Sequence, residues 1–491
     1  MKYYCLPLIL PFSQAVVADQ KSTDSIEVIT TTASRVEALS TPLPLSISTL
    51  TEAQLKSIAP THIEEALQRV AGANVQRGNG QEYLPALRSP VLSGAGACGG
   101  VLTLEDGIPL RAAGFCNINE LFESHSEMAQ RIEVLKGPGS ALYGSNAVHG
   151  VINVLTKTPS DEKELSFLAG PNARFQLQGT LGRETGQHGV SANFQAIDDG
   201  GYRDDSGFNS FKVNGRHNYE NGADVFSTLI SGFVLDQDTA GFISSGDNGS
   251  DCYSSDYDDA TLYKDREAME KNCNDDAYRK WSSLRITTRW QRTLNQDEQL
   301  SITPYFRVNE MEFRQHYLPS KAIEENDHYS VGVASNYHWQ VEPNLALVMG
   351  VDAEWTEGAL TQTQQKADTF SYGKARQQGV HYDYEVEALV IAPYLQADWQ
   401  ATDQLLFTGS IRYDASEYRY NNLIADGTLK ADGSACVNSS DEATPCLYLR
   451  PADSNDRYNN ASAKLGFNYQ LDSEIALFGA WSQGFRAPQT T

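Results

Sequence analysis

Apolar and polar side chains alternate with a period of two in the chain beyond residue 163. In one such stretch every second residue is apolar from Leu345 to Trp355, and the residues between them include Gly350, Asp352 and Glu354. This period predicts β-strands with one apolar face and one polar face. Thirteen strands are predicted, near residues 164–170, 173–184, 188–197, 210–220, 223–237, 277–294, 298–315, 328–341, 345–359, 382–400, 404–420, 457–471 and 474–486.

The connections between these strands follow a pattern of their own. Short connections lie at 184–187, 221–222, 295–297, 342–344, 401–403 and 471–473, and they alternate with long ones at 198–209, 238–276, 316–327, 360–381 and 421–456. Outer-membrane barrels have short periplasmic turns and long outer loops. A soluble β-sandwich shares the residue alternation but does not require this sorting by length. The sequence therefore predicts an all-β, antiparallel transmembrane barrel.

Aromatic residues near the strand ends are expected to form the girdles at the two membrane interfaces. The candidates are Trp281, Trp290, Trp339, Trp399, Tyr413 and Trp481.

Composition narrows the class of protein further. The 491 residues carry a formal net charge of -25, which argues against a nucleic acid partner. No run of 18 apolar residues occurs beyond the N-terminus, so no transmembrane helix is expected. Residues 1–18 have the features of a secretory signal peptide, with Lys2, an apolar stretch and small residues up to Ala18.

The segment before the strands has a different organisation. Helices are predicted at 52–58, with Thr51 as the N-cap, and at 62–70, with Thr61 as the N-cap. Residues 128–157, MAQRIEVLKGPGSALYGSNAVHGVINVLTK, read as a strand, a glycine turn, a helical turn capped by Ser140 and a second strand. This string resembles the end of the plug domain of TonB-dependent outer-membrane receptors. Residues 101–110, VLTLEDGIPL, resemble another strand and turn of that plug.

The resemblance implies a domain organisation. It places a signal peptide at 1–18, a TonB-box segment at 19–36, an α+β plug domain at 37–158 and the barrel at 159–491. Plugged barrels have about 22 strands. The thirteen predicted strands therefore imply that roughly nine are absent and that the barrel as written does not close.

The resemblance also implies binding sites. TonB, of the inner-membrane energy-coupling complex, is expected to bind an extended segment by strand addition. That segment consists of Ser25, Ile26, Glu27, Val28, Ile29 and Thr30. Ligand is expected to meet the outward-pointing plug loops, where the candidate contacts are Arg77, Ser93, Gly94, Gly96, Arg111 and Phe115. Solvated loop cations remain the alternative interpretation of Arg77 and Arg111.

Six cysteines remain after the predicted signal peptide: Cys98, Cys116, Cys252, Cys273, Cys436 and Cys446. An even number of cysteines in an exported chain indicates disulfides. Proximity in sequence favours the pairs 98–116, 252–273 and 436–446. Free thiols or a metal site are the alternatives, although the chain has no CxxC pair.

The function implied by the resemblance is energy-coupled import across the outer membrane of a Gram-negative bacterium. The expected protein is a monomer in contact with outer-membrane lipid, without a resident cofactor or metal. A ferric siderophore or a similar small metal chelate is the favoured ligand, and haem, cobalamin and an oligosaccharide are the alternative ligands. The rivals are a passive porin or adhesin barrel and a β-rich enzyme, for which the sequence offers no nucleophile–base set or phosphate loop.

Two further groups of residues were weighed as metal or haem contacts. The acidic loop with Asp247, Asp251, Asp256, Asp258 and Asp259 does not match calcium-loop spacing, so a solvated surface loop is the favoured interpretation. His316, His328 and His381 lie in or beside the predicted outer loops, where they are candidates to contact haem or a chelate.

Overall fold

The computed structural model describes Arg35 and residues 45–78, 80–91, 100–115, 120–241, 270–272, 276–315, 320–371, 374–438, 440, 442–472 and 475–489. Several predicted sites lie outside these described residues. They are the TonB-box residues 25–30, Ser93, Gly94, Gly96, His316, four of the cysteines (Cys98, Cys116, Cys252 and Cys273) and the acidic loop 247–259.

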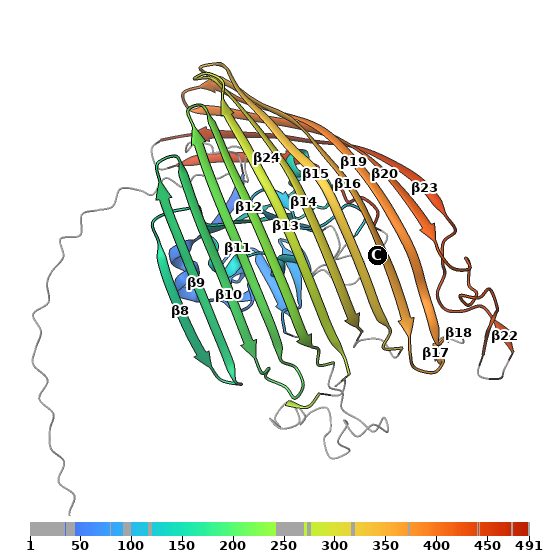
Figure 1. Cartoon of the computed structure of the whole chain (residues 1–491). Coiled ribbons are helices and arrows are strands. Elements are labelled where there is room, and N and C mark those ends of the chain that lie inside the picture. Colours follow the sequence, from blue (N-terminus) through green and yellow to red (C-terminus); the bar gives the residue numbers. More distant parts are fainter. Residues whose placement is uncertain are drawn as a thin grey trace, which may run out of the picture.

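Thirteen strands form one antiparallel sheet, which confirms the predicted number and fold class. They are β8 (Lys163–Gly170), β9 (Arg174–Thr185), β10 (His188–Asp199), β11 (Phe208–Asn221), β12 (Asp224–Asp238), β13 (Tyr278–Thr293), β14 (Glu298–Arg314), β15 (Ile323–Glu342), β16 (Leu345–Gln364), β19 (Gly379–Thr402), β20 (Leu405–Asn422), β23 (Ser454–Gln470) and β24 (Ala476–Ser482). Each strand pairs with its neighbours in this order. Figure 1 shows the sheet curving around the blue elements of the N-terminal domain.

The short and long connections fall at opposite ends of the sheet. Two residues join β15 to β16, whereas residues 365–378 join β16 to β19 and residues 423–453 join β20 to β23. These two long loops carry the small hairpins β17 (Thr369–Ser371) with β18 (Lys374–Arg376), and β21 (Cys436–Val437) with β22 (Ala443–Thr444). We call the two ends of the barrel the short-turn end and the long-loop end.

Several strands extend farther toward the long-loop end than predicted. β15 begins at Ile323 instead of residue 328, and β16 ends at Gln364 instead of residue 359. In these extensions polar residues lie on both faces of the sheet, as in the Glu324–Gln362 and Glu325–Thr361 pairs. Backbone pairing continues there although apolar and polar residues no longer alternate. The strand ends predicted from that alternation therefore fall short of the observed ends.

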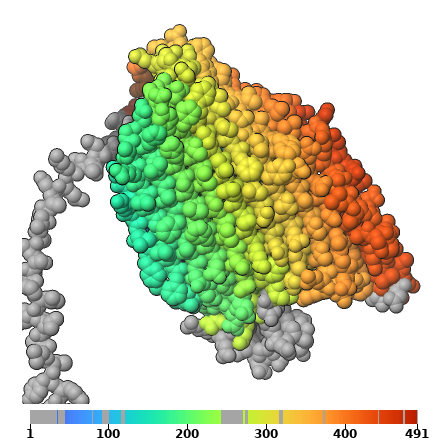
Figure 2. Space-filling view, viewed as in Figure 1, coloured from blue at the N-terminus to red at the C-terminus, as the bar shows by residue number. Residues whose placement is uncertain are grey.

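The apolar face of the sheet points outward. Large apolar side chains exposed on this face include Val190, Val213, Ile230, Leu284, Ile286, Val331, Val351, Leu389, Ile411 and Leu465. Inward positions carry buried polar residues such as Asn214, Ser231 and Arg285. This is the reverse of a soluble sheet and matches a lipid-facing barrel wall. The wall covers the plug in the space-filling view (Figure 2).

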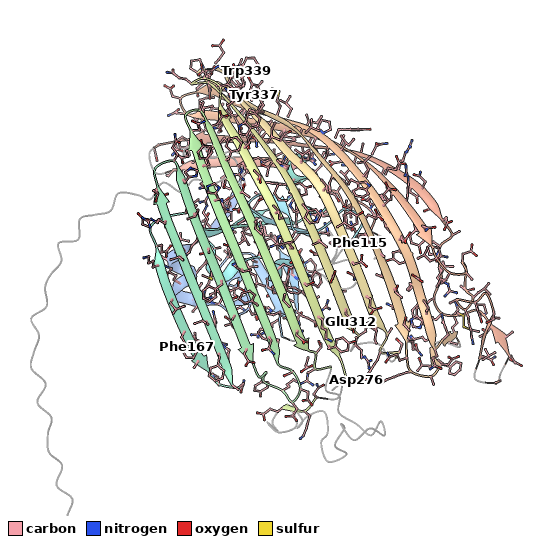
Figure 3. The ribbon with its side chains drawn as sticks, in the orientation of Figure 1. Phe115, Phe167, Asp276, Glu312, Tyr337 and Trp339 are labelled. Carbon is pink, nitrogen blue, oxygen red and sulfur yellow. A yellow bond between two sulfur atoms is a disulfide. The ribbon has the colours of Figure 1, made fainter. Side chains whose placement is uncertain are left out.

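Five of the six predicted girdle residues are exposed or half-buried on the barrel wall, although Tyr413 lies near the middle of β20 and not at a strand end. Trp339 and Tyr337 lie at the short-turn end in Figure 3, and Trp290 and Trp399 stack on Phe226 and Phe407. The prediction for Trp281 was wrong. Its ring is buried and meets Phe122 edge-on at 5.3 Å between ring centroids.

The plug is built on a five-stranded sheet in the order β1 (Ser46–Thr51), β6 (Arg131–Lys136), β7 (Gly150–Leu155), β4 (Val101–Glu105) and β5 (Ile108–Pro109). A separate hairpin joins β2 (Ala73–Arg77) to β3 (Tyr83–Leu87). The helices are α1 (Glu52–Ile58), α2 (Ile63–Leu67) and α3 (Ser140–Tyr143), with 3-10 turns η2 (Glu120–Glu123) and η3 (Ser126–Met128). None of the helices in the described part of the chain has the length and apolar character to cross a bilayer.

The helix starts differ in part from prediction. Thr51 caps α1, as predicted, and Gln54 completes a capping box that was not predicted there. The N-cap of α2 is His62 instead of Thr61, because the His62 ring accepts the Glu64 N–H while Thr61 bonds Glu65. Ser140 is the first residue of α3 and not its cap.

Two apolar clusters hold the plug together and against the wall. The first lies within the plug and includes Leu55, Leu67, Ile132 and Val154. The second joins Leu104, Leu142 and Val151 of the plug to Val348 and Tyr394 of the barrel. The plug therefore has a core of its own and a separate packed interface with the wall.

Candidate functional site

The plug apex meets the barrel near the long-loop end. Phe115 is buried in a cluster with Leu360, Tyr384, Val386 and Tyr418, and its ring centroid lies 5.2 Å from that of His328 (Figure 3). The turn before it needs Gly114, because its φ is +85° and an added Cβ would lie 3.2 Å from the Tyr418 ring. The turn therefore fixes Phe115 against the wall.

Of the predicted ligand contacts that are described, the structure brings two together. Arg111 is buried and lines a cavity with Gly114 and Tyr418, beside Phe115. Arg77 lies elsewhere, on the β2–β3 hairpin, where its guanidinium is 3.7 Å from the Glu65 carboxylate. The arrangement separates Arg77 from the Arg111–Phe115 pair.

A set of tyrosines that sequence reasoning missed lies near Phe115, on β19, β20, β23 and the 423–453 loop. Tyr384 and Tyr420 lie 4.9 Å apart between ring centroids, Tyr382 and Tyr448 lie 5.7 Å apart, and Tyr418 and Tyr458 lie 5.9 Å apart. The signal in the sequence was the spacing of two, since Tyr382 and Tyr384 share one face of β19 and Tyr418 and Tyr420 share one face of β20. We call this set the tyrosine wall.

Arg450 is the second element that the sequence did not reveal. It is only 1% exposed, and its guanidinium donates to the Ala425 and His381 carbonyl oxygens at 2.6 and 3.2 Å. Its Nη2 has no hydrogen-bond partner, and no carboxylate among the described residues forms an ion pair with it. Burial lowers the pKa of Arg450, and the phenols of Tyr382 and Tyr420 oppose that shift. A buried guanidinium with a free donor is a natural partner for an anion.

The disulfide between Cys436 and Cys446, as predicted, holds this region in place. Both cysteines pack on Ala375 of the neighbouring loop, whose carbonyl accepts the Leu447 N–H at 2.9 Å. Both ring nitrogens of His381 lie within hydrogen-bond distance of Gln362 and Gln377. The histidine therefore joins the end of β16 to the 365–378 loop, and the described residues offer no group of three or more metal ligands.

A different cluster surrounds Arg35, five positions after Thr30, the last residue of the predicted TonB-binding stretch Ser25–Thr30. Arg35 forms a 2.9 Å ion pair with Asp352 of β16 and stacks between Tyr143 of the plug and Tyr394 of the barrel, at 5.0 and 4.7 Å to the ring centroids. Burial would lower the pKa of Arg35, but Asp352 and the tyrosines raise it above its ordinary value. Arg35 therefore contacts both the plug and the barrel wall.

Buried ion pairs join the plug to the barrel across the rest of the interface. Acidic side chains come from the plug and basic ones from the wall, as in Glu127–Lys212 at 2.8 Å, Glu82–Arg279 at 3.0 Å and Asp106–Arg216. Arg285 binds two plug carboxylates, Glu105 at 3.1 Å and Glu123 at 2.8 Å.

His125 lies within this charged interface. Burial, then Lys212 and Arg285, hold the pKa of His125 well below its usual range, so the ring is neutral. The wall cations therefore carry the positive charge of the interface.

Comparison with known proteins agrees with this architecture. The family model for the TonB-dependent receptor plug domain matches residues 41–151, and the model for the TonB-dependent receptor-like β-barrel matches residues 165–491. Solved structures with a similar fold include three receptors. The ferric yersiniabactin uptake receptor FyuA from Yersinia pestis has 14% identity and a TM-score of 0.66, over 90% of this chain and 65% of that one.

The other two are the ferric-catecholate import receptor Fiu from E. coli K12 and the ferric citrate transporter FecA. FecA has 15% identity and a TM-score of 0.70, over 91% of this chain and 63% of that one. Fiu has 15% identity and a TM-score of 0.68, over 92% and 71%. The chain thus spans a little under two thirds of the length of FyuA and FecA. With a plug and a barrel matched over most of its length, the chain belongs to the TonB-dependent receptor family.

Proposed function

We propose that this chain serves an outer-membrane importer of a small anionic metal chelate, with a ferric siderophore as the leading candidate. In this proposal residues 1–18 direct export, 19–36 carry the TonB-box segment, 37–158 form the plug and 159–491 belong to the barrel. The long-loop end faces the medium and the short-turn end faces the periplasm, as in outer-membrane barrels generally.

The proposal that the ligand is anionic rests on the buried guanidinium of Arg450. It interacts with Tyr382 and Tyr420 of the tyrosine wall, which packs against Phe115 of the plug apex, and Arg111 lines a cavity with Tyr418. Aromatic faces favour a flat or aromatic ligand, and a desolvated cation favours a negative one. A neutral oligosaccharide would leave the guanidinium unpaired. The similar solved structures are described as handling ferric yersiniabactin, ferric citrate and ferric catecholates, which supports a ferric chelate.

The proposed energy source is TonB, acting on Ser25–Thr30. Arg35 supports this role, because it lies five residues farther along the chain and contacts both plug and wall. A pull on the TonB-box segment would load this anchor first. Import in this proposal is transport without chemical conversion of the ligand.

Binding measurements on an Arg450→Gln variant test the ligand class. The probes are two radioactive-iron chelates, an anionic tris-catecholate and a neutral tris-hydroxamate, bound to purified receptor. A hydrogen bond to a charged group is worth about 1.5–3 kcal/mol, so affinity for the catecholate should fall by about tenfold or more. Affinity for the hydroxamate should change little.

The matched control is Arg457→Gln, which removes an exposed guanidinium on β23 that pairs with Glu417 at the rim. It should leave both affinities unchanged. If Arg450→Gln leaves catecholate binding intact, or weakens both chelates equally while the disulfide still forms, the assignment of an anionic ligand to this site is wrong.

A further inference from the structure

Two histidines face each other on the outer surface of the barrel wall, near the short-turn end. His188 is the first residue of β10, and His217 lies near the end of β11, the neighbouring strand (Figure 1). Both side chains are exposed, on the face that also exposes Val190 and Val213. The pair therefore lies at the opposite end of the barrel from Arg450, and on the barrel's outer surface.

The two rings are close enough to share one small ligand. His188 Nδ1 lies 3.1 Å from His217 Nε2, and the ring planes are within 9° of each other. At this distance one ring donates its N–H and the other accepts it. Because each neutral ring can carry its proton on its other nitrogen instead, both facing nitrogens can offer a lone pair at the same time.

The sheet holds the two side chains at this separation. His188 pairs directly with Tyr219 and His217 with Val190, so the histidines are diagonal neighbours across the β10–β11 ladder. Strands β9 and β12 pair with β10 and β11 from the other sides, so both backbones are fixed. The Tyr219 ring also packs on the His188 ring, with 4.8 Å between the centroids. The site thus needs only these four consecutive strands.

Water reaches this part of the wall. Tyr219 continues into a row of rings, with Phe226 at 6.3 Å from Tyr219 and Trp290 at 6.4 Å from Phe226 between centroids. Aromatic girdles of this kind mark the level at which a barrel wall meets the aqueous phase. The histidines end the row, so their exposed rings are open to ions from solution.

The neighbouring positions leave the pair free of strong charges. The residues paired with the two histidines in the sheet are Thr185, Tyr219, Val190 and Thr228, and none of them is charged. No carboxylate at these positions holds either ring as an imidazolium, a form that does not bind metals. One cation, Arg183, shares the outer face opposite Val190, but its side chain is exposed to solvent, where salt screens its charge.

The spacing of the two nitrogens suits two donors to one metal ion. Metal–imidazole distances are about 2.0–2.1 Å, so two nitrogens 3.1 Å apart would subtend roughly 100° at the ion. That angle lies between the ~90° of adjacent ligands in a square-planar or octahedral site and the ~109° of a tetrahedral site. A modest turn of each exposed ring aims both lone pairs at the same point.

We propose that His188 and His217 form a chelating site for a divalent transition metal of the copper, nickel and zinc group. Imidazole nitrogens suit these ions, and the affinity of such sites reaches its maximum at Cu²⁺. Two protein ligands leave the other coordination positions to water, so the ion is exchangeable and not enclosed. The site is independent of the proposed import function, because it lies outside the barrel and uses none of the residues of the ligand site.

Copper titration of the purified protein tests the site. The protein is prepared in detergent with an affinity tag that contains no histidine, and Cu²⁺ alone is the probe. Calorimetry should show one binding event per chain that is tighter than any other, and the electron paramagnetic resonance spectrum of this first ion should show coupling to two nitrogens. His188→Gln and His217→Gln should each weaken the event about tenfold or more, because a single imidazole loses the gain from chelation.

Two matched controls separate the pair from other donors. His338 lies on β15 at the same end of the wall, and the residues paired with it, Gln299 and Val348, supply no second imidazole. His338→Gln should therefore bind the first Cu²⁺ as wild type does. Tyr219→Phe keeps a ring against His188 but removes the phenol, and it should also bind like wild type.

The copper complex of nitrilotriacetate tests the geometry. This chelator leaves only two adjacent positions of the ion open, so the complex binds tightly only where two donors have the right spacing. It should bind the wild-type protein and lose about tenfold or more of its affinity in either glutamine variant. Equal affinity for wild type and both variants, or no binding to wild type, would overturn the proposal.

Oxidation mapping locates the ion without any substitution, so it decides the question even if a variant does not fold. Bound Cu²⁺ with ascorbate in air oxidises the side chains that hold it. Peptide mass mapping of the wild-type protein should find His188 and His217 modified first. Modification elsewhere, with both histidines intact, would also overturn the proposal. None of these results bears on the Arg450 binding test.

Discussion

Replacing Arg285 by methionine should release the plug from the wall without unfolding the barrel. The guanidinium binds Glu105 at 3.1 Å and Glu123 at 2.8 Å, and both carboxylates are at most 4% exposed. Methionine fills similar space but removes the guanidinium from both buried carboxylates. The Ser231 hydroxyl and the His125 backbone N–H still donate to Glu105, and the Asn309 amide still donates to Glu123.

The magnitude follows from the burial of these charges. Removing one partner of a buried ion pair costs about 3–5 kcal/mol, because the charge left behind is desolvated and uncompensated. With a urea dependence of about 2 kcal/mol per molar for a domain of this size, the midpoint of plug release should fall by about 2 M. The barrel transition should stay where it is, since its strand pairing is unchanged.

Tryptophan fluorescence during a urea titration provides the assay. Trp281 contacts Phe122 of the plug, so its signal changes when the plug leaves, and a Trp281→Phe version identifies that component. Adding Glu123→Gln to Arg285→Met should recover part of the lost stability, because one buried charge disappears.

The control is Lys280→Met, which changes an exposed cation five positions away on the same strand. A shift below about 1 kcal/mol for Arg285→Met would refute the reasoning, since a buried pair must cost more than an exposed one. So would an equal shift of the barrel transition.

Three other predictions concern the plug and the cysteines. Burial, and then the charge of Arg77, lowers the pKa of His62 to about 3. The folded state therefore favours the neutral ring, so the free energy of unfolding is fully maintained above pH 6.5 and decreases as the pH falls toward 3. Urea titration at each pH should show a decrease of about 2 kcal/mol at pH 5, and this decrease should be absent in His62→Asn. Gly150→Ala should destabilise the plug by about 1–3 kcal/mol, because an added Cβ would lie 2.2 Å from the Leu135 carbonyl oxygen, whereas Gly107→Ala, with no atom within 4 Å, tests positive φ alone. Mass mapping of non-reduced protein should find Cys98 linked to Cys116 and Cys252 to Cys273, and free thiols there would contradict the predicted pairing.

The strands were predictable because, apart from their polar extensions toward the long-loop end, they cross the wall with a period of two, which the sequence shows directly. The same parity should have placed Trp281 correctly. It shares a face with Ser283 and Arg285, whereas Leu284 and Ile286 lie on the exposed face. Residue type, an aromatic near a strand end, was given more weight than parity, and parity was the stronger constraint.

The ligand site was less predictable because it is assembled from distant parts of the chain. Arg450 and the His381 carbonyl that it binds are 69 residues apart, and no local pattern links them. Phe115 and Arg111 could be proposed only through a family resemblance. The cap of α2 was missed because a histidine ring nitrogen replaced the usual hydroxyl as acceptor.

The most direct test of the central claim is radioactive-iron uptake by intact cells that express either the wild-type receptor or a variant lacking Ser25–Thr30. A ferric tris-catecholate is the probe, and binding at the cell surface is measured in parallel on cells without metabolic energy. The account predicts that the deletion leaves surface binding unchanged and abolishes accumulation, because the ligand site and the segment pulled by TonB are separate. Accumulation at the wild-type rate in the deletion variant would contradict energy-coupled import through this segment.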